Sequence, residues 1–203
     1  MVETGITPDF ITVDGSEGGT GAAPLEFSNA VGTPLRDALV LVNCTLTGVG
    51  LRDRVTIIAS GKAISAFHVL SLIALGADAV NSARAMMFAL GCIPSLSCNK
   101  DTYPTGIATQ NPVRYKSLDV NLKAVRVANY HAAMIKNVAK LLGATGLESL
   151  DKLRPEHINR RISTTEVKTY ADIYPHITEG SLLVSTGIPE AIKADWENSA
   201  ADR

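Results

Sequence analysis

The first half of the chain alternates short apolar runs with longer amphipathic segments. Three short runs, at residues 10–14, 55–59 and 79–82, are rich in β-branched residues and alanine and predict strands. The segments 34–48, which begins with proline and ends with glycine, and 64–75 predict helices, and 83–90 predicts a third. Strands that alternate with helices are joined by right-handed crossovers, so we expect an α/β fold with a parallel sheet.

The second half is organised differently. Residues 91–118 predict a long proline-containing loop, and 120–142 predict one long helix with apolar residues at three- and four-residue steps. Short helices are expected near residues 147–153 and 155–161, followed by an irregular tail.

Three strands are too few to close an eight-stranded barrel, which typically needs about 250 residues. We therefore expect residues 1–112 to form the C-terminal portion of a (β/α)₈ TIM barrel, and residues 113–203 to form a helical extension packed on it. The remaining strands would lie upstream in a longer parent, or come from another chain or by self-association, because an open parallel sheet leaves unpaired edges.

Composition narrows the function classes. Hydrophobic residues make up 46% of the chain and charged residues 19%, which is ordinary for a globular protein. The net charge of −1 gives no electrostatic case for binding nucleic acid, and no apolar run predicts a membrane span. Three cysteines and an N-terminus without signal-peptide features predict a cytoplasmic setting.

A glycine-rich loop follows the first predicted strand. It contains Gly18, Gly19, Thr20 and Gly21, and glycines let backbone N–H groups approach a ligand closely. The spacing matches neither a dinucleotide-binding fingerprint nor a P-loop. A connecting loop without a ligand is an equally good interpretation of the composition.

Two further loops follow the second and third strands. One contains Gly61 and Lys62, and the other contains Ser82, Ala83 and Arg84. In (β/α)₈ barrels, the loops after the last two strands commonly bind phosphate together with a helix N-terminus. For either loop alone, an ordinary helix start is the better interpretation. Both loops in this order make a phosphate site an equally good interpretation.

The three cysteines fall into a pair in the loop and one on a predicted helix. Cys92 and Cys98 lie in the proline-containing loop and are either two ligands of an iron–sulfur cluster or two buried structural thiols. Cys44 lies on an apolar helix face and is expected in the core. The four histidines show no metal-ligand spacing.

Several blocks in order resemble the FMN-binding glutamate synthase family, in the C-terminal part of the flavin domain of the large subunit. They are residues 8–24, 51–62, 76–92 and 104–110. The resemblance implies a flavoenzyme that reduces the imine of 2-oxoglutarate and ammonia to glutamate. It places Gly18 to Gly21 at the flavin, and Gly61 and Ser82 to Arg84 at its phosphate. The family's flavin-proximal lysine and most 2-oxoglutarate contacts would precede residue 1, so no catalytic residue is assigned.

One position departs from the family. Members with a cluster carry three cysteines in this loop, the last before a Pro-Thr/Val-Gly segment. Cys92 and Cys98 match two positions, but Tyr103 stands at the third, before Pro104. The resemblance implies FMN as the cofactor. Because a phenolate is a hard oxygen ligand, we expect no intact 3Fe–4S cluster. Two alternatives stay open: a non-catalytic barrel fragment acting as an assembly or interaction subunit, and a phosphate-binding barrel with different FMN or nucleotide chemistry.

Overall fold

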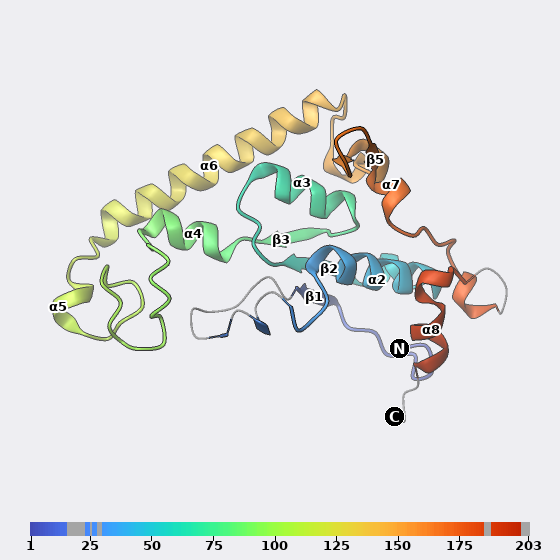
Figure 1. Ribbon diagram of the computed structural model, residues 1–203, viewed down its shortest axis with the longest axis horizontal. Coiled ribbons are helices and arrows are strands. Elements are labelled where there is room, and N and C mark those ends of the chain that lie inside the picture. The colour runs from blue at the N-terminus through green and yellow to red at the C-terminus, as the bar shows by residue number, and fades with distance from the viewer. Residues whose placement is uncertain (16–22, 25, 28–29, 185–187, 200–203) are drawn as a thin grey trace.

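Three parallel strands form the centre of the protein (Figure 1). The computed structural model describes residues 1–203 except 16–22, 25, 28–29, 185–187 and 200–203. The strands are β1 (Phe10–Asp14), β2 (Thr56–Ser60) and β3 (Ala79–Asn81), in that spatial order. Their parallel pairing and order confirm the prediction, with β2 one residue later than expected.

Helices α2 (Leu35–Gly48) and α3 (Ala66–Ala74) supply the larger part of the core over the sheet. Helix α6 (Val120–Ala144) crosses α3 and α4 (Ala83–Leu90), and α5 (Pro112–Tyr115) lies beside its start (Figure 1). Although α6 has 25 residues, no helix in the described part of the chain is both long and apolar enough to cross a membrane.

The two faces of the sheet differ in burial. Alternate residues Val13, Ile57 and Ala59 are buried with apolar residues of α2 and α3, as strand periodicity requires. On the opposite face Phe10 is 58% exposed, and Thr12 is exposed as well. The sheet is therefore packed on one side and open on the other.

The C-terminal third corrects two expectations, the short helix near residues 155–161 and the irregular tail after it, where a strand and short helical segments are found. A helix over residues 155–161 is wrong beyond His157, because Asn159–Arg161 (β4) pairs antiparallel with Val167–Thr169 (β5). β-Branched Val167 and Thr169 favour this extended pairing, and the Tyr170 N–H donates to the Ile158 carbonyl. The other short elements are η1 (Arg52–Arg54), η2 (Leu150–Lys152), η3 (Pro155–His157), α7 (Tyr170–Ile173), η4 (Ser181–Leu183) and α8 (Glu190–Asn198).

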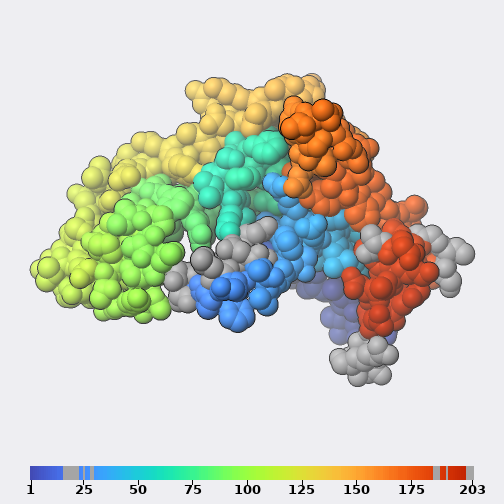
Figure 2. All heavy atoms as spheres, viewed as in Figure 1, coloured from blue at the N-terminus to red at the C-terminus, as the bar shows by residue number. Residues whose placement is uncertain are grey.

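The space-filling view shows how these parts are distributed. The loop after α4 and the start of α6 occupy one end, α6 runs along one side, and the C-terminal segment with α8 occupies the other end (Figure 2). The sheet and its two covering helices lie between them.

The amino ends of β2 and β3 are tied together by one arginine. The Arg52 guanidinium donates to the Asn43 side chain at 2.8 Å, and to the carbonyls of Val55 and Gly76 at 3.1 and 2.9 Å. It also donates to both carboxylate oxygens of Asp78, at 2.8 and 2.9 Å. One planar cation thus joins α2, the start of β2 and the turn before β3.

Replacing Arg52 with lysine is expected to lower the free energy of unfolding by roughly 1–3 kcal/mol, since an ammonium cannot reproduce this fork. The ion pair itself contributes little of that, because Asp78 is 45% exposed. Urea unfolding measures the loss, and Arg54→Lys, which removes only a 3.3 Å contact with Thr7, is the control. Equal stabilities of the two variants would show that Arg52 does not connect these elements.

Candidate functional site

The carboxyl ends of the three strands lie side by side. Asp14 is paired with Ser60, and Ser60 with Asn81. The Gly15 N–H then donates to the Ser60 carbonyl at 3.1 Å, which continues the first ladder into the loop. The loops after all three strands therefore start at one edge of the sheet, as the sequence predicts.

Gly15 is held against the start of α2. A methyl group on Gly15 would lie 2.4 Å from Leu35 Cβ and 2.5 Å from Leu35 Cα. Only glycine allows this approach of backbone to helix. The contact sets where the glycine-rich loop leaves the sheet. Its predicted ligand residues Gly18, Gly19, Thr20 and Gly21 lie outside the described residues.

The second and third loops contact each other. Gly61 has φ 150° and Lys62 has φ 42°, so the chain turns through conformations that residues other than glycine rarely adopt. The Ser82 hydroxyl donates to the Ala63 carbonyl at 2.7 Å. This bond joins the loop containing Gly61 and Lys62 to the N-terminus of α4.

The two helix N-termini at this edge are capped differently. In α3 the Ser65 hydroxyl accepts from the His68 N–H, and the His68 imidazole accepts from the Ser65 N–H. The N-cap of α4 is Ser82, whose side chain makes no capping bond. The Ser82 hydroxyl donates to the Ala63 carbonyl instead. The N-cap residue therefore offers no side-chain acceptor to the backbone N–H groups at the positive end of the α4 dipole.

Two cations and the exposed carboxylate of Asp14, the last residue of β1, lie at this edge. The exposed Lys62 and Arg84 follow β2 and β3, and Arg84 is the second residue of α4. Two cations beside a helix N-terminus form an arrangement suited to a phosphate group.

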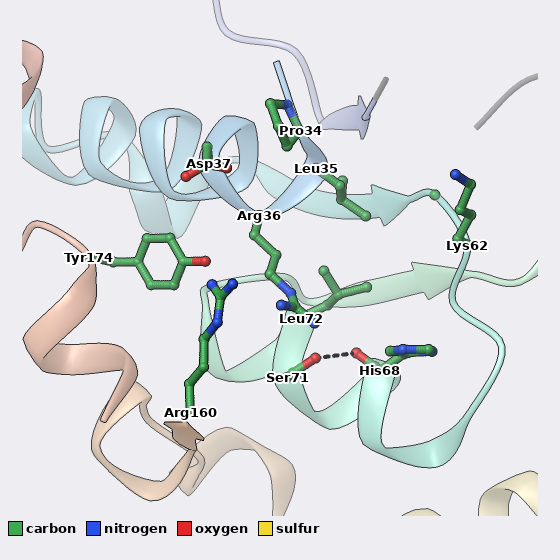
Figure 3. A pocket seen from close by; sticks show the side chains of 11 residues that line it. Pro34, Leu35, Arg36, Asp37, Lys62, His68, Ser71, Leu72, Arg160 and Tyr174 are labelled. Atoms are coloured by element: carbon green, nitrogen blue, oxygen red, sulfur yellow. Dashed lines mark hydrogen bonds between the residues drawn. The ribbon is translucent and has the colours of Figure 1, made fainter. Parts of the chain in front are cut away.

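A cleft of about 340 Å³, lined at one end by Gly61 and Lys62, lies between the start of α2 and helix α3 (Figure 3). Arg36 reaches into it from α2, and Arg160 from β4. Tyr174 lines the same cleft, where burial and the Asp37 carboxylate raise the pKa of its hydroxyl, burial being the larger cause.

Sequence reasoning missed Arg36, Arg160 and Tyr174. Arg36 lies two residues after Pro34, the N-cap of α2, and this spacing marks a residue in the first turn of a helix. No comparable signal identifies Arg160 and Tyr174, because they reach the cleft through the unpredicted hairpin and the segment after α7.

A larger cavity of about 780 Å³ lies beside Arg52, Gly76 and Asp78. These residues precede β2 and β3, so the cavity is at the amino ends of the strands. Ligands of parallel α/β sheets bind at the carboxyl ends. We therefore assign the candidate site to the carboxyl ends of the strands, although the cavity at their amino ends has the larger volume.

The cysteines are only partly as expected. Cys44 is 4% exposed in the core, and its burial raises the pKa of the thiol. The interpretation of Cys92 and Cys98 as two buried structural thiols is wrong for Cys98, which is exposed, while Cys92 is half-buried. Cys98 lies in a turn of the irregular segment after α4.

A parallel α/β sheet with anion-binding features at its strand ends is typical of phosphate-binding α/β proteins. The protein-family model described as "Conserved region in glutamate synthase" matches residues 2–148. The chain belongs to this glutamate synthase family.

Three relatives illustrate the similarity. The glutamate synthase large subunit-like protein YerD of Bacillus subtilis is 44% identical over 158 residues, covering 78% of this chain and 30% of the relative. The archaeal glutamate synthase (NADPH) of Methanocaldococcus jannaschii is 44% identical over 146 residues, which cover 72% of this chain and 29% of the relative. The glutamate synthase (NADPH) large chain of Bacillus subtilis is 33% identical over 147 residues, which cover 72% of this chain and 10% of the relative. The chain thus spans less than a third of each relative's length.

Substituting Gly15 with alanine is expected to lower the free energy of unfolding by roughly 1–3 kcal/mol, because the added methyl group overlaps Leu35 backbone and Cβ atoms. The control is Gly143→Ala in α6, where nothing lies within 4 Å of the new methyl group. That variant should be neutral or more stable by up to about 1 kcal/mol. Thermal or urea unfolding of both variants measures the change in the free energy of unfolding. A Gly15→Ala variant as stable as the wild type would contradict the close contact.

Proposed function

We propose that this chain supplies the phosphate-binding side of the FMN site in a glutamate synthase-type flavoenzyme. The enzyme would form glutamate by FMN-dependent reduction of the imine from 2-oxoglutarate and ammonia. The observation that carries the proposal is the junction of the Gly61 loop with the N-terminus of α4, tied by the Ser82–Ala63 bond at the carboxyl edge of a parallel sheet. Family membership supports the same assignment.

The donors at this junction fit a phosphate. The phosphate group of FMN carries close to two negative charges, and the α4 N-terminus offers backbone N–H groups that Ser82 does not cap. Arg84 and Lys62 add full positive charges, and Gly61 lets the backbone approach closely. Bound FMN would supply the hydride-transfer chemistry, while these residues hold its phosphate.

The remainder of the active site would come from the rest of the barrel. The open sheet face with Phe10 and Thr12 has the exposure expected of a barrel interior that lacks its other strands. We propose that residues 1–112 belong to that barrel and that 113–203 pack on its outside. The catalytic residues and most contacts with 2-oxoglutarate would lie in the part that completes the barrel.

Flavin binding should therefore depend on barrel completion. The isolated chain lacks the strands that would enclose the isoalloxazine ring, so its affinity for FMN should be high-micromolar or weaker. A chimera that joins the upstream part of YerD to residues 1–203 should bind FMN tightly, retain its absorbance on purification and form glutamate when the flavin is reduced.

Within this chimera, Arg84→Gln should weaken FMN binding roughly tenfold to a hundredfold, the loss of one charge-assisted contact. Fluorescence quenching of FMN measures it, and Arg126→Gln on the exposed side of α6 is the matched control. A folded chimera without flavin affinity would overturn the proposal and favour an interaction subunit. Nanomolar FMN binding by the isolated chain would contradict the need for barrel completion.

A further inference from the structure

Tyr103 is anchored inside the loop that follows α4. Its side chain is 0% exposed, although the loop around it is mostly open to solvent. Its hydroxyl accepts the Ile93 N–H at 3.0 Å and lies 2.9 Å from Cys92 Sγ. A buried phenol thus joins the two ends of the segment from Cys92 to Tyr103.

The donor set does not fit an iron–sulfur cluster. Such clusters are held by cysteine thiolates, and Tyr103 occupies the position where the resembled family has its third cysteine. A phenolate oxygen is too hard a ligand to replace thiolate. Cys92 is in contact with that phenol, whereas Cys98 is exposed. Among the residues that the structure describes, no three His, Cys, Asp or Glu side chains are grouped so that they could hold a metal ion.

Neighbouring bonds show that this loop is braced by the protein itself. The Arg114 guanidinium donates to the Thr102 carbonyl at 2.7 Å, next to Tyr103. The Asp101 carboxylate accepts the Gln110 N–H at 2.5 Å. These bonds join the two residues before Tyr103 to residues 110–114 after it, and the tyrosine hydroxyl contacts the residues that follow α4.

Gly106 adds a close backbone contact to this bracing. Its φ is 81°, and a methyl group there would lie 2.4 Å from the Arg114 carbonyl oxygen. The Gly106 N–H donates to the Tyr103 carbonyl at 3.2 Å. The main chain on both sides of Tyr103 is therefore held by hydrogen bonds and packing.

We propose that Tyr103 takes over the structural role of an iron–sulfur cluster in this chain. Its hydroxyl binds Cys92 and the Ile93 backbone, so that the loop keeps its shape without iron and the Cys92 thiol is withheld from metals and electrophiles. Cys98 then remains as an ordinary exposed thiol. This inference concerns the loop alone and does not depend on flavin binding.

The test uses the full 203-residue chain, purified anaerobically under reducing conditions and incubated with ferrous iron and sulfide. The wild-type chain should acquire no stoichiometric iron or acid-labile sulfide. Iodoacetamide should alkylate Cys98 rapidly and Cys92 slowly, as read by peptide mass spectrometry. Tyr103→Phe, which keeps the ring and removes the hydroxyl, should lower the melting temperature by about 2–8 °C and speed Cys92 alkylation several-fold.

Tyr115→Phe in α5 is the matched control, because Tyr115 is 44% exposed in the same region. It should leave the melting temperature and the alkylation of Cys92 unchanged. Stoichiometric iron and sulfide in the wild-type chain would overturn the proposal. So would a Tyr103→Phe variant with wild-type melting temperature and wild-type Cys92 reactivity, since the hydroxyl would then hold nothing in place.

Discussion

A parallel sheet is normally covered on both faces, and its edge strands can pair with further strands; here the described residues cover one face only. Helices α2 and α3 cover the face formed by Val13, Ile57 and Ala59. The other face exposes Phe10 and Thr12, and within the described part of the chain β1 and β3 each pair with β2 alone. Exposed strand edges and apolar faces favour association with another segment. The coverage of less than a third of each relative's length agrees with a sheet that other strands complete.

The same sheet places the candidate site. Because Asp14, Ser60 and Asn81 are in register, their three loops begin together, and the Ser82–Ala63 bond joins two of them. The bond also occupies the hydroxyl that would otherwise cap α4. One hydrogen bond therefore connects the loops and keeps the N-cap side chain away from the proposed phosphate position. At the amino ends of the strands, Arg52 joins the start of β2 to the turn before β3 through its bonds with Gly76 and Asp78.

The sequence predicts the strands, the main helices and the common edge from which the three loops start, because strand and helix periodicity and loop glycines are local signals. It does not predict the β4–β5 hairpin, whose strands are short and exposed and have no clear apolar alternation. Arg36 and Arg160 line the same cleft only through tertiary packing, so no spacing in the sequence predicts that they lie in one cleft. Tyr103 is visible as a departure from the family pattern, but its burial and its contact with Cys92 are properties of the folded loop.

The central claim is that further strands complete this sheet at its edges. Hydrogen–deuterium exchange of the isolated chain and of the chimera with the upstream part of YerD tests it directly, with β2 as an internal reference because it is already paired on both sides. The account predicts that amides of β1 and β3 exchange faster than those of β2 in the isolated chain, and that the chimera slows them by about tenfold or more. Equal protection of all three strands in the isolated chain, or unchanged exchange of β1 and β3 in a folded chimera, would contradict it.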